Sequence, residues 1–484
     1  NRMRLAIEIV SRTRNAVGES FLLMYRISLL DLVENGCQWE DTVTLAKRLE
    51  TAGVDVFNSG IGWHEARIPT IAHNVPAAAW SWATGKLRRE LAIPIIATNR
   101  INTPEQAEAV LAAGDADLIS MARPFLADPA FVAKAQNDSA AAINTCIGCN
   151  QACLDQIFRQ QLCSCMVNPR ACRETEAQPA RTSAPKRIAV VGGGPAGLAC
   201  AVTAAQRGHR VTLFEAAKRI GGQFNLAATI PGKSDYAETI RYFRQQLIEH
   251  QVDVRLSHQV TTDELVAEGY KEVVLATGVT PRKPAIAGID HPKVVDYQQL
   301  LEQQMEPGNR IAIIGAGGIG MDVAEYLCGR EPDDQQAELN QFLDFWGVDR
   351  NTSDRGALKQ PLARKPERTI YLCQRQPGLP GKGVGLTTVW AHRLSLQKKG
   401  VQFVAEVSYD RIDDAGLHLS IDGEPRLLEV DQVINCSGQQ AHNPLAETLA
   451  ARGITCHSIG GAATADRLNA VRAIGEGTRI GDQL

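Results

Sequence analysis

The chain has 484 residues, of which 44% are hydrophobic and 22% charged, and its formal net charge is −3. This composition is typical of a globular protein with several domains, and the near-neutral balance argues against nucleic acid or an anionic membrane surface as a partner. The sequence shows no apolar run long enough to span a bilayer and no signal-peptide pattern. We therefore expect a cytoplasmic monomer that needs no obligatory protein partner.

Residues 1–140 alternate helical patterns with short runs typical of strands. Strands are expected over 21–28, 54–60, 93–99 and 116–122, and a helix is expected to begin at Thr103-Pro104. Four βα units at this spacing predict the C-terminal half of a (β/α)8 TIM barrel, which cannot close its sheet alone. A doubly wound sheet is the alternative, but no glycine-rich turn follows the first strand. The chain opens inside a helical pattern without a methionine, so we expect it to start in mid-domain.

Barrel active sites lie at the carboxyl ends of the strands, and polar residues occur at these points of the sequence. We expect Arg100, Arg123 and the backbone near Ala122 to hold a flavin phosphate. Arg26 is a candidate for stabilising the anionic reduced flavin. His64, in the loop after the second strand, is a candidate for polarising a substrate or orienting a proton donor. Each of these residues taken alone is more often structural.

Five cysteines are crowded into residues 146–165, beginning with a C-x2-C-x3-C pattern at Cys146. In a reducing compartment such a cluster indicates a metal centre rather than disulfides. Structural zinc usually pairs two separated C-x2-C knuckles, and the second knuckle is missing here, so a [4Fe–4S] cluster is favoured over zinc or plain buried thiols. Spacing alone leaves three candidates for the fourth ligand: Cys163, Cys165 and Cys172.

A glycine-rich turn follows the polar linker of residues 176–186 and an apolar strand. Its G-x-G-x-x-G motif consists of Gly192, Gly194 and Gly197, and the next helix opens with Pro195 and Ala196. Such a turn lets a dinucleotide pyrophosphate approach the helix N-terminus, and an acid at the end of the next strand, here Glu215, accepts from a ribose hydroxyl. The stretch GGQF that follows favours FAD. The structural alternative is a turn that serves packing only.

A second copy of this pattern consists of Gly315, Gly317 and Gly320. A polar insertion of roughly residues 330–365 precedes the next strand, which ends in Arg375 where an NAD site would carry an acid. Arginine accommodates a 2′-phosphate, so NADPH is favoured over NADH, unless Arg375 is merely a solvated strand end. Gly278, at the end of a later strand, is expected to approach a cofactor closely.

The chain resembles the bacterial NADPH-dependent 2,4-dienoyl-CoA reductases, in the iron–sulfur branch of the old-yellow-enzyme family. The resemblance lies in GIGWHEARIPT, TNRINTP, SMARPFLADP, NTCIGCNQACLDQIF, VNPRAC and the two glycine-rich turns, and it covers essentially the whole chain. It implies this domain order: a partial TIM barrel for FMN and substrate (1–140), a [4Fe–4S] segment (141–175), a linker (176–186), an FAD-binding domain (187–300 and 440–484) and an NADPH-binding domain (301–439).

The resemblance also implies individual contacts. By ligand, these are the cluster ligands Cys146, Cys149, Cys153 and Cys165; the FMN contacts Arg26, Arg100, Ala122 and Arg123; the substrate contacts His64, Glu65, Ala66 and Arg67, with His64 catalytic; the FAD contacts Glu215, Gln223, Val260, Gly278 and Gly461; and the NADPH 2′-phosphate contact Arg375.

The implied reaction is NADPH-dependent reduction of 2,4-dienoyl-CoA to enoyl-CoA in the β-oxidation of unsaturated fatty acids. The implied electron path runs from NADPH through FAD, the cluster and FMN to the acyl-CoA thioester. Two alternatives are another iron–sulfur flavoenzyme, similar to enoate reductases or trimethylamine dehydrogenase, and a bare electron-transfer module. The chain departs from the family by lacking the first barrel half, with its tyrosine proton donor, and by having Gln376, Leu379 and Leu386 where lysines are expected.

Overall fold

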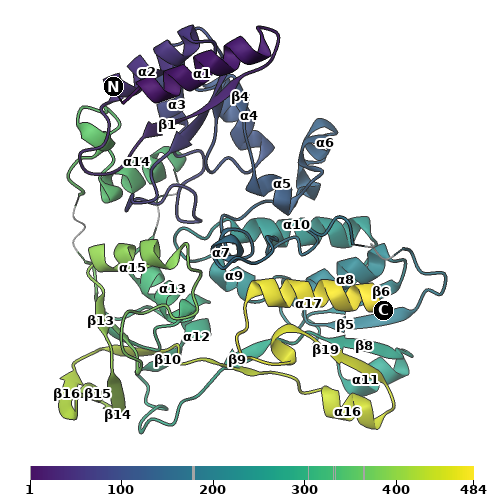
Figure 1. Cartoon of the computed structure of the whole chain (residues 1–484). Helices are drawn as coiled ribbons and strands as arrows, with labels where there is room; N and C mark the ends of the chain where they lie inside the picture. Colours follow the sequence, from purple (N-terminus) through teal and green to yellow (C-terminus); the bar gives the residue numbers. More distant parts are fainter. Residues whose placement is uncertain (1, 177–179, 303–304, 331, 333, 363–365) are drawn as a thin grey trace. The chain divides into compact units, whose positions relative to one another are not determined.

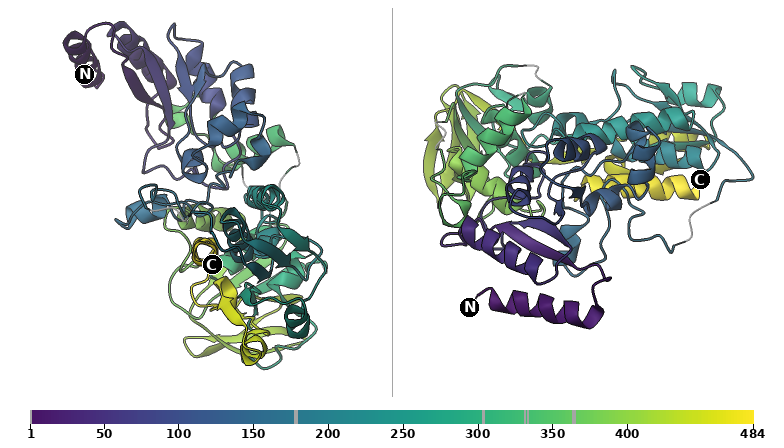
Figure 2. Two further views of the ribbon diagram at one scale, coloured as in Figure 1. Left: turned by 90° about the vertical axis from the view of Figure 1, so that its right-hand side faces the viewer. Right: turned by 90° about the horizontal axis from the view of Figure 1, so that it is seen from above.

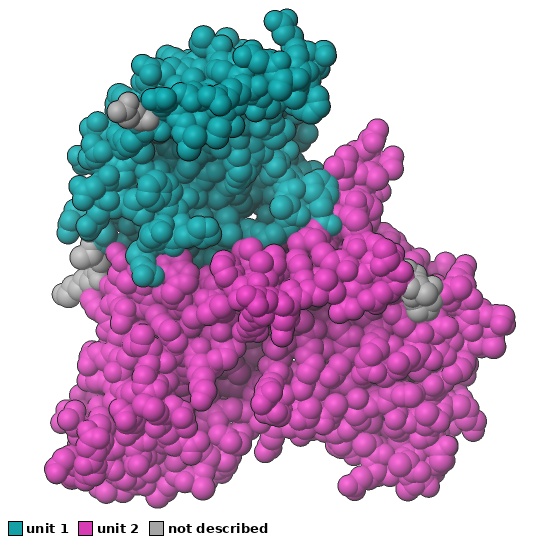
Figure 3. Space-filling view, viewed as in Figure 1, with its two compact units in different colours: residues 1–125, 331–364 teal, residues 126–330, 365–484 magenta. Residues whose placement is uncertain are grey.

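The computed structural model describes residues 2–484 except 177–179, 303–304, 331, 333 and 363–365. It divides into two compact units, coloured separately in Figure 3: residues 1–125 with 331–364, and residues 126–330 with 365–484. Both units combine helices with parallel sheets, which confirms the predicted α/β class. No helix in the described part of the chain has the length and apolar character needed to cross a membrane.

The first unit is built on a four-stranded parallel sheet whose strands run in chain order, β1-β2-β3-β4. Its elements before residue 126 are α1 (Arg4–Val17), β1 (Met24–Leu30), α2 (Trp39–Thr51), β2 (Val56–Ile61), α3 (Ser81–Arg88), β3 (Ile95–Ala97), α4 (Pro104–Ala112), β4 (Leu118–Ile119) and the start of α5 (Arg123–Ala127). Among the described residues β1 and β4 are the open edges of this sheet, and the strand order shows no switch point. The half barrel itself stays a prediction.

Local sequence explains where these elements begin and pack. The predicted helix start at Thr103 is confirmed, because its hydroxyl accepts from the backbone N–H of Gln106 at 3.3 Å and Pro104 is the first helical residue. Phe57 and Ile95 are paired across β2 and β3 and are fully buried. All four predicted strands form, each somewhat shorter than its apolar run.

The polar insertion packs as part of the first unit. Its helix α14 (Gln335–Trp346) places Phe342 edge-on to Trp80, with 6.1 Å between ring centroids. Further along, the backbone of Gly356 accepts from Leu32 N at 3.0 Å and donates to Cys37 O at 2.9 Å. The segment expected within the second nucleotide module therefore completes the core of a different unit.

The second unit contains two parallel sheets of five strands each (Figure 1). The first sheet has the order β19-β8-β5-β6-β7. It and its helices comprise β5 (Arg187–Val191), α8 (Pro195–Gln206), β6 (Arg210–Phe214), α9 (Gln223–Ala227), α10 (Tyr236–Glu249), β7 (Asp253–Arg255), α11 (Thr262–Ala267), β8 (Glu272–Leu275), α16 (Ala446–Ala451), β19 (Thr455–Ser458) and α17 (Ala470–Gln483). Helix α17 lies along α8 (Figure 2), and its Ile474 is buried in the same core as Ala199.

The second sheet has the order β10-β17-β11-β12-β13. Its elements, with an attached antiparallel sheet and a linking strand pair, are β9 (Val279–Pro281), β10 (Val294–Asp296), α12 (Tyr297–Leu301), β11 (Arg310–Ile314), α13 (Gly318–Leu327), β12 (Thr369–Cys373), α15 (Val389–Lys398), β13 (Gln402–Val404), β14 (Val407–Asp413), β15 (Gly416–Ile421), β16 (Glu424–Leu428), β17 (Gln432–Asn435) and β18 (Gln439–Ala441). Strands β9 and β18 pair antiparallel and carry the chain between the two modules.

Candidate functional site

The first glycine-rich turn joins β5 to α8 as the sequence predicted. A Cβ atom at Gly192 would lie 2.3 Å from the carbonyl oxygen of Ala276, and one at Gly197 would lie 1.9 Å from the carbonyl oxygen of Gly192. Only glycine allows this approach of the turn to the end of β8, and the φ of Gly192 is +112°. Gly194 is the N-cap of α8, so the helix N-terminus faces the turn.

Glu215 directly follows β6 and holds this turn. One carboxylate oxygen accepts from Gly193 N at 2.6 Å and the other from Ala217 N at 2.7 Å. Because the carboxylate is half-buried against the glycine-rich turn, it stands where an acid meets the ribose in a dinucleotide site.

The other expected FAD contacts lie at or near the same edge of the first sheet. Gly278 follows β8, and a Cβ at Gly461 would approach the backbone of Gly278 to 2.9 Å, so these two positions are packed together. Val260 is 4% exposed and belongs to a hydrophobic core that also contains Phe214 of β6 and Leu275 of β8. Gln223 opens α9 and donates to the hydroxyl of Tyr297 at 3.2 Å.

Two polar residues at this place escaped the sequence analysis. Gln439 donates to Tyr297 Oη at 2.7 Å and to the side-chain oxygen of Gln223 at 3.3 Å. Burial raises the pKa of Tyr297 to about 12. The available signals were that Gln439 directly follows a glycine at the end of an apolar strand, and that Asp296 begins a capping box at Tyr297.

The second glycine-rich turn repeats the geometry of the first between β11 and α13. Gly315 has a φ of +104°, and a Cβ at Gly320 would lie 1.9 Å from its carbonyl oxygen. Gly317 is the N-cap of α13 and has open space beside it. This open space leaves room for a ligand at the backbone.

Arg375 follows the end of β12 and is exposed. The side chain of the preceding Gln374 donates back to the carbonyls of Gln376 at 3.0 Å and Gly378 at 2.8 Å, so Gln374 shapes the loop and Arg375 extends from it. The positive charge of Arg375 acts on Tyr409: burial and then Cys373 raise the pKa of that tyrosine, and Arg375 opposes the rise. A fixed loop with one exposed guanidinium suits recognition of a phosphate.

The cysteine segment brings four thiols together. Burial raises the pKa of Cys149 well above the usual value, and negative charge on Cys165, Cys146 and Cys153 adds to this effect. Burial, with Cys146 second, raises the pKa of Cys165 to about 12. Cys163 instead faces Cys172, and burial followed by that neighbour raises its pKa to about 11. The structure thus groups Cys165 with the C-x2-C-x3-C cysteines.

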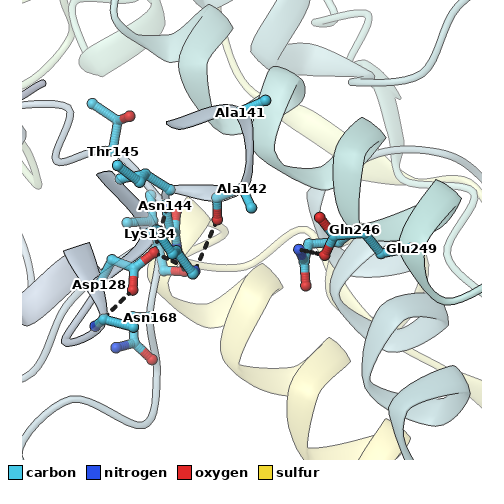
Figure 4. A network of polar contacts seen from close by, with 12 residues as sticks. Asp128, Lys134, Ala141, Ala142, Asn144, Thr145, Asn168, Gln246 and Glu249 are labelled. Atoms are coloured by element: carbon cyan, nitrogen blue, oxygen red, sulfur yellow. Dashed lines mark hydrogen bonds and ion pairs between the residues drawn. The ribbon is translucent and has the colours of Figure 1, made fainter. Parts of the chain in front are cut away.

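A polar network braces the two ends of this segment (Figure 4). The buried carboxylate of Asp128 accepts from Lys134 Nζ at 2.6 Å and from Asn144 N at 2.8 Å. The side-chain amide of Asn144 donates to Val167 O at 2.7 Å, and that of Asn168 donates to Leu126 O at 2.9 Å. The chain before Cys146 is therefore tied to the chain after Cys165.

In the first unit, the expected FMN residues Arg100, Ala122 and Arg123 follow strand ends, but Arg26 does not, because β1 continues beyond it to Leu30. Arg26 on β1 is paired in register with Asn58 on β2, and its guanidinium donates to the Asn58 side chain. Arg100 is buried and donates from Nε to Val75 O at 2.7 Å, and Arg123 donates to Ile71 O at 2.7 Å. Both arginines thus hold the segment between β2 and α3, while Ala122 lies just before the short helix α5.

The expected substrate residues lie in the turn after β2. His64, Glu65 and Arg67 are exposed, and Ala66 is 8% exposed, with its N–H donating to Trp63 O at 3.1 Å. Sequence reasoning missed the hydroxyl cluster beneath this turn, in which Thr98 Oγ1 donates to Ser59 O at 2.7 Å. The sequence signal for this cluster was that polar residues occur at the ends of adjacent parallel strands.

A model of the pyridine nucleotide-disulphide oxidoreductase family matches residues 186–474, the span that carries both turns. The chain belongs to this family. Residues 1–141 match a second family, NADH:flavin oxidoreductase / NADH oxidase. The protein is therefore a pyridine nucleotide-disulphide oxidoreductase joined to an old-yellow-enzyme-like part, which confirms the resemblance at this coarser level.

Three proteins illustrate what this pyridine nucleotide-disulphide oxidoreductase is similar to. A metal reductase of Desulforamulus reducens is 33% identical over 452 residues, which are 93% of this chain and 66% of that protein. A cinnamate reductase of Clostridium sporogenes is 28% identical over 68% of this chain and 51% of its own length. The solved complex of 2-naphthoyl-CoA reductase with 2-naphthoyl-CoA superposes with a TM-score of 0.88 at 29% identity, covering 100% of this chain and 68% of that one. The chain thus spans 51% to 68% of the length of these relatives.

The four thiols that lie together in the cysteine segment are the donor set that a [4Fe–4S] cluster takes, so these residues fit such a group. A cubane cluster takes one thiolate on each iron, so its ligands surround a larger volume than those of a single ion.

Proposed function

We propose that the protein is an NADPH-dependent reductase of conjugated acyl-CoA thioesters, with 2,4-dienoyl-CoA as substrate and enoyl-CoA as product. The observation that carries this proposal is the likeness, over the whole chain, to the reductase solved with 2-naphthoyl-CoA, another conjugated CoA thioester. The separate flavin-oxidoreductase and pyridine-nucleotide parts support it, because one part can oxidise NADPH while the other carries a flavin that reduces a carbon–carbon double bond.

The residues divide into four groups in this proposal. The second turn and Arg375 bind NADPH, and the first turn with Glu215 and Gln223 binds FAD. Cys146, Cys149, Cys153 and Cys165 hold the [4Fe–4S] cluster, and Arg26, Arg100 and Arg123 belong to the FMN site. When bound, the two flavins and the cluster supply the conversion between hydride transfer and single-electron transfer.

In this proposal, the side chains of the chain bind the nucleotides and orient the flavin and the substrate. Glu215 accepts a ribose hydroxyl beside the N-terminus of α8, and Arg375 neutralises a 2′-phosphate. Arg26 is fixed by Asn58 and so presents a positive charge where negative charge develops during reduction. The exposed His64 holds a proton at an imidazole nitrogen near the substrate carbonyl.

Steady-state oxidation of NADPH by the whole protein, with candidate acceptors, tests this function. We expect turnover with 2,4-dienoyl-CoA, none with the free dienoic acid, and slower turnover with NADH than with NADPH. Absence of NADPH oxidation with every conjugated CoA thioester tried would exclude the proposal.

An enoate-reductase-like activity is the second candidate, and the similarity to cinnamate reductase favours it. Its substrate would be a free unsaturated acid. Comparing cinnamate with cinnamoyl-CoA as acceptors separates the two candidates, since they differ only in the thioester.

A further inference from the structure

The loop of residues 374–388 carries Arg375 and lies on the second glycine-rich turn. The N–H of Gly381 donates to the carbonyl oxygen of Ala316, within that turn, at 2.7 Å. Arg393 on α15 donates from Nε to Pro380 O at 2.6 Å. The middle of the loop is therefore anchored at the place where the nucleotide is expected to bind.

The far end of the loop is anchored on the cysteine segment. Asp155, two residues after Cys153 and in α7 (Leu154–Phe158), is only 2% exposed. Its Oδ1 accepts from the backbone N–H of Thr387 at 2.8 Å and from the Thr387 hydroxyl at 2.7 Å. A Cβ at Gly385 would lie 2.4 Å from Oδ2, so the carboxylate packs directly on the loop.

Burying a carboxylate is costly, and hydrogen bonds from the loop offset that cost only while the loop stays in place. The contact is therefore specific to one loop conformation. Without the carboxylate, Thr387 loses an acceptor for two donors, while the anchors at Gly381, Pro380 and Gln376 remain. The end of the loop between Gly381 and Thr387, which lies on the second glycine-rich turn, is then held less firmly.

We propose that Asp155 is a positioning residue for the nucleotide loop, and that it joins the order of this loop to the cysteine segment. The inference rests on the proposed function in taking the nucleotide at the second turn to be NADPH. Asp155 acts through Thr387 and touches no nucleotide itself. Because binding and loop order are linked, loosening the loop weakens nucleotide binding.

The test compares four variants of the full chain: Asp155→Ala, Asp155→Asn, Thr387→Val and, as matched control, Thr448→Val. Thr448→Val removes a hydroxyl of the same kind from α16, where the hydroxyl contacts Thr262 and donates to Leu445 O. Two properties are measured: NADP⁺ affinity by titration calorimetry, and the rate of trypsin cleavage after the exposed Lys382 in the loop.

We expect Asp155→Ala to weaken NADP⁺ binding roughly tenfold and to speed cleavage after Lys382. Asp155→Asn keeps an oxygen that can accept from both Thr387 donors, so it should stay close to the wild type. Thr387→Val loses one of the two bonds and should fall between, and Thr448→Val should change neither property.

Wild-type affinity and wild-type cleavage in Asp155→Ala would overturn the proposal. If that variant does not fold, Thr387→Val decides the question, because it changes the same contact from the other side and leaves the cysteine segment intact. If the wild type binds NAD⁺ but not NADP⁺, the cofactor assignment fails, and the same comparison made with NAD⁺ still decides the role of Asp155. If the wild type binds neither nucleotide, the proposed function fails. The cleavage rates after Lys382 then decide whether Asp155 holds the loop in place.

Discussion

Asn144 donates from its side-chain amide to the carbonyl oxygen of Val167, and this bond closes the cysteine segment into a loop. Asn144 lies two residues before Cys146, and Val167 lies two residues after Cys165. The bond is buried and, with the contacts of Asp128 and Asn168, it fixes the chain beside the first and last expected cluster ligands.

Asn144→Ala should lower iron content per chain and destabilise the protein. It leaves the buried Val167 carbonyl without this donor, which costs about 1–3 kcal/mol. Iron analysis of the purified protein and thermal unfolding measure the two effects. Asn443→Ala is the control, because it removes a side-chain hydrogen bond to Ser458, which is the last residue of β19. Full iron content in Asn144→Ala would contradict the bracing role.

Gly320→Ala and Gly317→Ala should have separable effects. The added methyl at Gly320 would lie 1.9 Å from Gly315 O, so the turn cannot form and both stability and NADP⁺ binding should fall. A methyl at Gly317 meets no protein atom within 4 Å, so stability should be unchanged while the nucleotide is obstructed. Calorimetry of unfolding and of NADP⁺ binding checks this, and unchanged binding in Gly317→Ala would place the nucleotide elsewhere.

Arg375→Ala should reduce the preference for NADPH over NADH by roughly ten- to a hundredfold, as expected for loss of a charge-assisted bond to phosphate. Binding of NADH should change little. The ratio of kcat/KM for the two nucleotides, measured with an artificial electron acceptor, gives the answer. Arg426→Ala removes an exposed arginine of β16 and should leave the ratio as it is.

His209 should make the protein less stable as the pH falls below about 6.5. Its Nδ1 accepts from Lys186 N at 3.1 Å, and burial, with the charges of Arg207 and Lys186, lowers its pKa from 6.5. In this window the unfolded chain binds the proton and the folded chain does not. Protonation therefore stabilises the unfolded state, and the free energy of unfolding decreases as the pH falls. His209→Gln should flatten the dependence of Tm on pH between about pH 7 and about pH 5. An equally steep dependence in the variant would assign the effect to other groups.

Local signals predicted much of the fold and site. The Thr103-Pro104 helix start and both glycine-rich turns formed as expected, because they depend on residues close in sequence. Spacing could not decide whether Cys163 or Cys165 is the fourth expected cluster ligand. The two residues are only two positions apart, so either one could reach the same region. Their different neighbours, Cys146 and Cys172, are set by tertiary packing.

The insertion was the main part that sequence patterns left open. Its helix α14 has an apolar face, but the pattern carries no information about which surface covers that face. The contact of Phe342 with Trp80 joins residues far apart in the chain, and only the structure shows it.

The same insertion sets an order for synthesis. Trp80 and the backbone of Leu32 leave the ribosome long before Phe342 and Gly356, which cover and bond to them. The nascent first unit must therefore wait with an uncovered aromatic surface until most of the chain is made, and a chaperone that binds exposed aromatic side chains would find its target there.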